Sequence, residues 1–338
     1  MRPIRYVKCD TTRQAVHAVE STPGAIFFAG GTTLIDLMKL DVMTPQTLVD
    51  IRKLPFLDIQ MDEKGVHIGA NVSNSQLAWD PLICQRYPAL SEAILSGATT
   101  QLRNMATAAG NIMQRTRCSY FRDVYSSCNK RDPGSGCSAI NGINRGHAIL
   151  GTSKSCIAMY PSDMCTALVI FDANVRIQKR DGSIRRIPLN DFHLLPGDTP
   201  NRETVLKHGE LITHVDLPHS PFARNSHYLK VRDRASYEFA LASAAVAIDL
   251  DGNTIRSARI ALGGVATKPW RCFDAENELS GRAPTQESFN TTAELALAGA
   301  NPQKGNKFKI ELAKHTLITC LGEVVERIRS LPAERAIA

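Results

Sequence analysis

The stretch Phe28-Ala29-Gly30-Gly31-Thr32-Thr33-Leu34 indicates most about the fold of this 338-residue chain. The apolar run Ala25–Ala29 is typical of a buried strand, and Leu34–Lys39 favours a helix. Glycines let a backbone approach a ligand, and the start of a helix carries partial positive charge. This strand–turn–helix pattern therefore predicts an anion site, although it matches neither a G-x-G-x-x-G fingerprint nor a Walker A loop. A purely structural turn is the alternative.

A second turn of small residues, Thr107-Ala108-Ala109-Gly110-Asn111, follows a helical stretch further along the chain. Later, the pair Ser162-Asp163 opens an apolar segment that continues to Phe171. A polar pair before an apolar run is typical of a helix start, so Asp163 as a helix N-cap is one interpretation.

The whole pattern predicts an α+β protein with domains at 1–220 and 221–338, the first divided into 1–55 and 56–220. The expected strands outside the glycine turn are 4–8, 47–50, 173–179, 182–188, 211–217, 228–232 and 255–262. The expected helices are 12–20, 88–96, 291–298, 307–320 and 323–328. An Asp-Gly-Asn turn at 251–253 joins the last strands into an antiparallel meander.

Charge and hydropathy exclude several classes of protein. The formal net charge is +7, but no run of five basic residues occurs, which argues against nucleic-acid binding. A bound anionic cofactor or an acidic partner explains the charge as well. No apolar run approaches the roughly 20 residues of a membrane helix, so we expect no membrane insertion. The first residues also contain no apolar segment typical of a signal peptide.

The nine cysteines are unevenly distributed. Four of them lie close together among Gly, Asn and Ser residues typical of loops: Cys118, Cys128, Cys137 and Cys156. Thiolates on loops can converge on Zn(II) or on an iron–sulfur cluster, and scattered free thiols are the alternative. No C-x-x-C pair occurs, which disfavours a zinc finger. The remaining cysteines are in apolar or helix-like settings typical of packing: Cys9, Cys84, Cys165, Cys272 and Cys320.

Taken together, the motifs resemble the FAD-binding subunits of the xanthine dehydrogenase/aldehyde oxidoreductase family of molybdenum hydroxylases. They are the two glycine-containing turns, Ser162-Asp163, and Leu262-Gly263-Gly264-Val265-Ala266 followed by Lys268, Pro269 and Arg271. The resemblance covers nearly the whole chain. It implies a vanillyl-alcohol-oxidase/PCMH-type FAD-binding domain of two subdomains, and a CO-dehydrogenase-flavoprotein-like C-terminal domain made of an antiparallel sheet with helices.

The resemblance also implies roles for single residues. The first turn would bind the FAD pyrophosphate through backbone N–H groups: Phe28, Ala29, Gly30, Gly31, Thr32, Thr33 and Leu34. Thr107, Gly110 and Asn111 would form a second wall that donates to pyrophosphate or ribose. Asp163, oriented by Ser162, would accept from ribose or adenine, and Lys230 would lie near the isoalloxazine. A solvated strand-edge lysine is the alternative for Lys230.

Most members of the family lack the segment 115–160. It resembles an insertion that holds a [4Fe-4S] cluster in the FAD subunits of bacterial periplasmic aldehyde oxidoreductases, and a similar insertion of hydroxybenzoyl-CoA reductase. The implied ligands are Cys118, Cys128, Cys137 and Cys156, because a cubane takes four thiolates and Cys165 belongs to an apolar, helix-like segment.

The resemblance implies an electron-transfer flavoprotein subunit of an aldehyde oxidoreductase that has no catalytic residues for the substrate. It would pass electrons from a [2Fe-2S] small subunit and a molybdenum-cofactor large subunit to an external acceptor, within a heterotrimer. A xanthine dehydrogenase or hydroxybenzoyl-CoA reductase complex, a zinc-containing scaffold and a nucleic-acid-binding module are the alternatives. We expect a periplasmic location through co-export with a twin-arginine-signalled partner, or else a cytoplasmic one.

Overall fold

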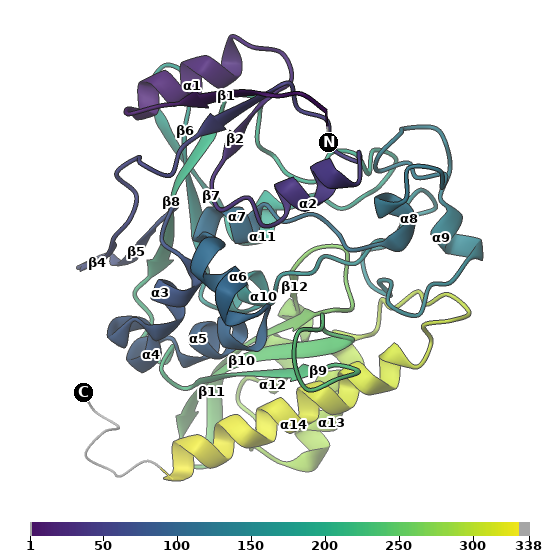
Figure 1. Ribbon diagram of the computed structural model, residues 1–338. Coiled ribbons are helices and arrows are strands. Elements are labelled where there is room, and N and C mark those ends of the chain that lie inside the picture. The colour runs from purple at the N-terminus through teal and green to yellow at the C-terminus, as the bar shows by residue number, and fades with distance from the viewer. Residues whose placement is uncertain (1, 331–338) are drawn as a thin grey trace.

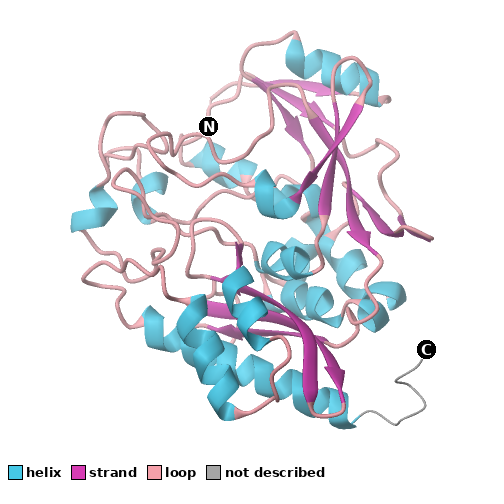
Figure 2. Ribbon diagram, turned by 180° about the vertical axis from the view of Figure 1, so that it is seen from behind, coloured by secondary structure: helices cyan, strands magenta, loops and turns pink. Residues whose placement is uncertain are grey.

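The computed structural model describes residues 2–330, in which three β-sheets are each covered by helices (Figure 1). The N-terminal and C-terminal sheets lie at opposite ends of the molecule. The long strands of the third sheet run along one side, and loops with the short helices α8 (Ser119–Arg122) and α9 (Ser138–Asn141) lie along the other. The view from behind shows the same separation of a sheet-rich side from a loop-rich side (Figure 2).

The N-terminal sheet contains the glycine turn. Its parallel strands are arranged in the order β1 (Arg5–Lys8), β3 (Thr47–Asp50) and β2 (Ala25–Phe28). Helix α1 (Thr12–Glu20) has the predicted bounds, and it begins with a capping box between Thr11 and Gln14. Strand β2 ends at Phe28 and helix α2 (Leu34–Lys39) begins at Leu34, so the predicted strand–turn–helix is present.

The five-stranded sheet is antiparallel throughout and lies within the predicted domain 1–220. Its order is β4 (Ile59–Asp62), β5 (Gly65–Gly69), β8 (Leu211–Pro218), β6 (Asn174–Gln178) and β7 (Ile184–Pro188). The associated helices are α3 (Asn74–Trp79), α4 (Pro81–Arg86), α5 (Pro88–Ser96), α6 (Thr100–Met105), α7 (Ala108–Ile112), α10 (Asp163–Ile170) and α11 (Leu189–Phe192). One large apolar core joins this sheet to these helices except α6, which has no buried residue.

The C-terminal sheet is the predicted antiparallel meander. Its order is β12 (Trp270–Arg271), β11 (Thr254–Gly263), β10 (Ala242–Asp251) and β9 (Ser226–Val231). Helices α12 (Phe273–Leu279), α13 (Gln286–Ala296) and α14 (Lys309–Ser330) share its apolar core. Residues 331–338 of the predicted C-terminal domain lie outside the described residues.

Helix α14 corrects one prediction, because it runs unbroken where two helices, 307–320 and 323–328, were expected. Glycine costs about 1 kcal/mol within a helix. Around Gly322, however, Leu321, Val324 and Val325 are buried in the core, and this burial holds the helix together. Among the described residues, no helix has both the length and the apolar character needed to span a membrane.

Candidate functional site

The two glycine-containing turns pack against each other. A Cβ atom on Gly30 would lie 1.9 Å from the carbonyl oxygen of Met105, just before the second turn. The close approach that glycine allows at position 30 is therefore to the chain itself, and the expected contact of this turn with a pyrophosphate through backbone N–H groups stays a prediction. Gly31 has a φ of +72°, a left-handed conformation that favours glycine.

Two cavities adjoin these turns and share part of their walls. The first has a volume of about 640 Å³ and the second of about 580 Å³, within the range of roughly 300–1,000 Å³ typical of small-molecule sites. Residues of both turns line both cavities: Thr32, Thr33, Ala106 and Gly110, together with Gln114. The two cavities are therefore adjacent at the two glycine-containing turns.

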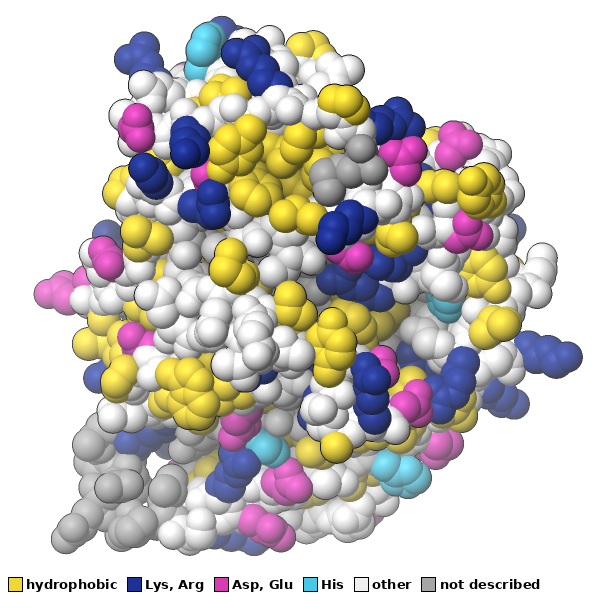
Figure 3. Space-filling view, in the orientation of Figure 1, with side chains coloured by type: hydrophobic (Ala, Val, Ile, Leu, Met, Phe, Trp, Pro, Cys, Tyr) yellow, Lys and Arg dark blue, Asp and Glu magenta, His cyan; other side chains and the backbone are white. Residues whose placement is uncertain are grey.

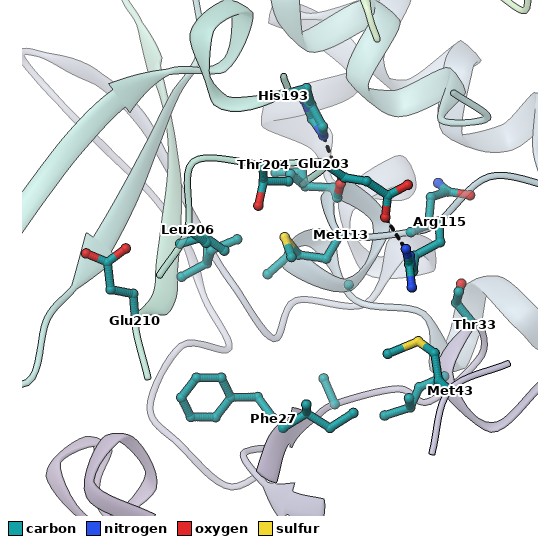
Figure 4. A pocket seen from close by; sticks show the side chains of 18 of the residues that line it. Phe27, Thr33, Met43, Met113, Arg115, His193, Glu203, Thr204, Leu206 and Glu210 are labelled. Atoms are coloured by element: carbon teal, nitrogen blue, oxygen red, sulfur yellow. Dashed lines mark hydrogen bonds and ion pairs between the residues drawn. The ribbon is translucent and has the colours of Figure 1, made fainter. Parts of the chain in front are cut away.

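The first cavity lies beneath α1 and has a largely apolar wall (Figures 3 and 4). One polar part of this wall is an ion-pair cluster that includes Arg115 and Lys130 of the cysteine-containing segment. Glu203 accepts a hydrogen bond from Arg115 Nε at 2.5 Å and pairs with Lys130 Nζ at 2.9 Å. Burial alone would raise the pKa of Glu203, but the charges of Arg115 and Lys130 hold that pKa below its usual value.

The second cavity is more polar and mostly basic. Five basic side chains line it: Arg103, Arg117, Arg122, Lys230 and Arg234. Three acidic side chains accompany them: Asp36, Asp163 and Glu238. Lys and Arg side chains gather around a hollow in the face that Figure 3 shows. The excess of positive charge favours an anionic ligand.

Lys230 and Asp163 form a buried ion pair in the second cavity. The distance from Lys230 Nζ to Asp163 Oδ2 is 2.8 Å, and the two side chains are 3% and 11% exposed. Tyr228 donates its hydroxyl proton to the other oxygen of Asp163, at 2.5 Å. Lys230 also donates to the carbonyl of Ser96 at 3.3 Å. The alternative of a solvated lysine at a strand edge is therefore wrong.

The N-cap of α10 is Ser162 rather than Asp163. The hydroxyl of Ser162 accepts a hydrogen bond from the N–H of Cys165 at 3.0 Å and donates to Asn111 Oδ1 at 2.6 Å. In the second turn, Thr107 Oγ1 accepts from the N–H of Gly110 at 3.2 Å. The amide of Gly110, expected to donate to a ligand, is thus engaged in the cap of α7.

Two non-glycine residues in the wall of the second cavity have left-handed backbone conformations. Ala98 and Tyr237 both have a φ of +53°. Such conformations cost free energy for residues with a side chain and concentrate at ligand-binding sites. Their presence here supports a binding role for this cavity.

Helix α2 connects the first turn with the cysteine-containing segment. Asp36 on α2 accepts hydrogen bonds from both terminal nitrogens of Arg122, at 2.8 and 3.1 Å, and these bonds lower the pKa of the carboxyl group. Leu37, on the same helix, is buried in a small core with Phe121 and Cys128. One short helix therefore joins the turn beside both cavities to the cysteines.

The structure brings the four predicted cysteine ligands together around one small cavity, which Cys118, Cys128, Cys137 and Cys156 all line. Cys128 and Cys137 face each other in an isolated antiparallel bridge. Cys128 and Cys156 are 6% and 5% exposed. Among residues 2–330, no group of three or more His, Cys, Asp or Glu side chains is arranged to hold a single metal ion.

Cys165 lies apart from this group, fully buried in α10, where the sequence predicted a packed helix. Its sulfur is 3.2 Å from the hydroxyl of Tyr160, and burial raises the pKa of its thiol to about 11. Burial also raises the pKa of Cys118 to about 12. Such thiols stay protonated at neutral pH unless a metal displaces the proton.

Several residues of the site could not be identified from the sequence. Tyr228 contacts the predicted residue Asp163, whereas Asp36 and Glu203 pair with basic residues of the cysteine-containing segment. These contacts arise only through the fold, and no local motif marks the three residues. Arg117 was visible only as a neighbour of Cys118. Its guanidinium lies 3.4 Å from Asp36 and 3.4 Å from the hydroxyl of Thr33 in the first turn.

Comparisons with known proteins agree with this architecture. Residues 2–220 match the family model "FAD binding domain in molybdopterin dehydrogenase", and residues 227–324 match "CO dehydrogenase flavoprotein C-terminal domain". The solved structures of quinoline 2-oxidoreductase from Pseudomonas putida 86 and of CO dehydrogenase from Oligotropha carboxidovorans both superpose with a TM-score of 0.75. The first is 21% identical and the second 22% identical to this chain. Both matches cover 96% of this chain, and they cover 98% of the first solved chain and 99% of the second, so they show the fold.

Among curated proteins, the aldehyde oxidoreductase FAD-binding subunit PaoB of Escherichia coli (strain K12) is 47% identical over 324 residues, covering 96% of this chain and 98% of that protein. The glyceraldehyde dehydrogenase medium chain of Sulfolobus acidocaldarius is 26% identical over 303 residues, covering 89% of this chain and 90% of the relative. The predicted family and fold class are confirmed. The chain belongs to the family of FAD-binding subunits of molybdenum hydroxylases.

Proposed function

We propose that this chain is the electron-transfer subunit of an aldehyde oxidoreductase and carries both FAD and a [4Fe-4S] cluster. In this proposal it receives electrons from partner [2Fe-2S] clusters and passes them to an external acceptor. The observation that carries the proposal is helix α2, which begins at the turn beside both cavities and packs by Leu37 against Phe121 and Cys128. A flavin and a cluster bound at these two places would be neighbours.

The residues of the two cavities fit FAD. Its pyrophosphate is an anion, and the shared wall at Thr32 and Thr33 stands between an apolar cavity and a basic one. We assign the pyrophosphate to this wall, the adenine end to the first cavity and the isoalloxazine to the second. The flavin supplies redox chemistry, while the protein binds and orients it and sets the charge around it.

The ion pair between Lys230 and Asp163 changes the roles expected for these two residues. Adenine and isoalloxazine are at opposite ends of FAD, so residues 2.8 Å apart do not serve both ends of an extended molecule. We therefore assign both residues to the isoalloxazine end. Asp163, itself fixed by Tyr228, positions the Lys230 ammonium, and the ammonium favours negative charge on the ring.

The four cysteines that line one cavity are the ligand set that a [4Fe-4S] cluster takes. All four cysteines lie in the inserted segment 115–160, and three of them come before residue 140. There, Gly134 and Gly136 both have positive φ and let the loop fold back on itself. Burial raises the pKa of the thiols of Cys118 and Cys156, and metal binding would deprotonate them. The cluster supplies one-electron chemistry or orders this loop.

Aldehyde oxidation is proposed from the 47% identical relative. The partners would be a [2Fe-2S] small subunit and a molybdenum-cofactor large subunit in a heterotrimer, because the chain is proposed to contain no substrate-oxidising centre. The test compares the purified chain with the reconstituted complex. We expect no aldehyde turnover by the chain alone, and aldehyde-dependent bleaching of the flavin in the complex. Aldehyde turnover by the pure chain would contradict the proposal, and turnover of purines instead of aldehydes would favour the xanthine dehydrogenase alternative.

We also propose that the assembled complex is periplasmic and is exported with a partner that carries a twin-arginine signal. The resemblance to periplasmic aldehyde oxidoreductases supports this location. Fractionation of cells with and without a functional twin-arginine pathway tests it. The chain should appear in the periplasm only with the pathway, and a cytoplasmic complex in both strains would reject the proposal.

A further inference from the structure

The imidazole of His147 lies directly against one of the four clustered cysteines. Its Nε2 atom is 3.1 Å from the sulfur of Cys118, within hydrogen-bond distance for sulfur. His147 is 6% exposed and belongs to the same inserted segment, close in sequence to Cys156. His147 is therefore buried at this contact, while Cys118 is partly exposed.

The backbone of His147 is fixed from the C-terminal domain. Its carbonyl oxygen accepts hydrogen bonds from Lys309 Nζ at 3.1 Å and from Asn306 Nδ2 at 3.2 Å. Lys309 is 0% exposed and also donates to the carbonyl of Gly264 at 2.6 Å. The N–H of His147 donates to the carbonyl of Asn144 at 3.0 Å. The position of the ring therefore depends on packing of the two domains rather than on the loop alone.

The environment of the ring also determines which nitrogen carries a proton. The Nδ1 atom is buried and has no hydrogen-bond partner within residues 2–330. A proton on Nδ1 alone would leave a buried N–H unpaired and would point a lone pair at the sulfur. A metal-bound Cys118 is a thiolate and can only accept. Neutral or protonated, the ring therefore presents Nε2–H to the sulfur.

We propose that His147 donates an N–H···S hydrogen bond to the Cys118 thiolate and thereby raises the reduction potential of the cluster. This inference rests on the proposed function, since it requires the [4Fe-4S] cluster. Hydrogen bonds to ligand sulfurs withdraw charge from them and favour the reduced cluster, which carries the additional electron. His147 is thus a positioning residue, outside the four ligands.

The test uses the full chain with its cofactors and two variants. His147→Phe keeps an aromatic ring but removes the donor, and His147→Gln keeps an N–H donor. His315→Phe changes an exposed histidine on α14 and is the control. Iron analysis reports cluster content, and a redox titration followed by low-temperature EPR reports the potential. ¹⁵N-histidine labelling adds a direct measurement, the hyperfine coupling of a histidine nitrogen to the reduced cluster.

We expect a ¹⁵N coupling in the wild-type protein that disappears in His147→Phe. The potential should shift to more negative values in His147→Phe, return part of the way in His147→Gln and stay unchanged in His315→Phe. An unchanged potential in an iron-containing His147→Phe variant would overturn the inference. The absence of a ¹⁵N coupling in the iron-containing wild-type protein would also overturn the inference. This measurement does not depend on the variants and can be made even if both variants lose iron. A wild-type protein without iron would instead overturn the proposed function itself.

Discussion

Asp36 and Arg122 form a two-point ion pair, with hydrogen bonds of 2.8 and 3.1 Å, between the helix that follows the glycine turn and the segment that carries the cysteines. These residues are 86 positions apart in sequence. The pair and the apolar contact of Leu37 with Cys128 hold two candidate redox sites together. Helix α2 is therefore the connection between the two candidate redox sites.

The first prediction tests this connection. Asp36→Ala removes the acceptor for Arg122 and Arg117, so the cysteine segment should open more often. We expect iron to be lost to a chelator several-fold faster than from the wild-type protein. Asp41→Ala is the matched control, because Asp41 pairs with Arg2 on an exposed part of the surface. Equal rates of iron loss in both variants would show that the ion pair does not hold the segment.

The second prediction concerns Gly31. Alanine there must adopt a φ of +72°, at a cost of roughly 1–2 kcal/mol, and its Cβ would lie 2.7 Å from the ring of Phe28. We expect reduced stability together with a loss of FAD, measured by thermal unfolding and by flavin absorbance. Gly182→Ala imposes a similar φ of +80° in the hairpin between β6 and β7, where no atom lies within 4 Å of the added Cβ. This control should lose only the stability that the left-handed backbone costs and should keep its FAD. FAD loss in both variants would point to general instability.

The third prediction concerns the ion pair of Lys230 and Asp163. Lys230→Met leaves a buried carboxylate with one remaining side-chain partner among residues 2–330, Tyr228, and breaking such a pair typically costs about 3–5 kcal/mol. We expect a lower free energy of unfolding and weaker FAD binding. The double variant Lys230→Met/Asp163→Asn should recover much of the stability without recovering the affinity for FAD. Recovery of both would place the isoalloxazine elsewhere.

The fourth prediction concerns pH and Lys309. Burial, with a smaller effect of Arg145, lowers the pKa of the Lys309 ammonium from 10.5 to about 7. Between these two pH values the unfolded chain binds more protons at this residue than the folded chain, so stability rises with pH. Denaturant unfolding should give the free energies of unfolding of the wild-type protein and of Lys309→Met. The wild-type value minus the variant value should increase from about pH 7 toward pH 10. A difference that is constant with pH would show that Lys309 keeps its ordinary pKa.

Local sequence signals predicted much of the fold. Helix α1 was expected at its observed bounds because Thr11 caps it and its apolar residues recur with helical spacing. The strand–turn–helix around Gly30 and the meander of the C-terminal domain were found for similar local reasons. Continuity of α14 through Gly322 was not predicted, since burial of flanking residues such as Leu321 overrides the local propensity of glycine.

The candidate site was only partly predictable, because its pairings are long-range. The sequence marked Asp163 and Lys230 separately, yet gave no sign that strand β9 and helix α10 bring them to 2.8 Å. Similarly, the sequence grouped the cysteines but did not indicate that His147 adjoins Cys118. Single-residue motifs indicate which groups are present, and the tertiary contacts determine what each group can do.

The most direct test of the account is the iron and flavin content of the purified chain and of two cysteine variants, supported by low-temperature EPR of the reduced protein. The wild-type protein should contain about four irons per chain together with FAD. Cys165→Ala should keep both, because Cys165 is buried in α10 away from the cavity that the other cysteines line. Cys156→Ser should lose or convert the cluster while keeping FAD, since a hydroxyl is a harder and less acidic ligand than a thiol. A chain with FAD but no iron, or a Cys156→Ser variant that keeps its iron beside a Cys165→Ala variant that loses it, would contradict the account.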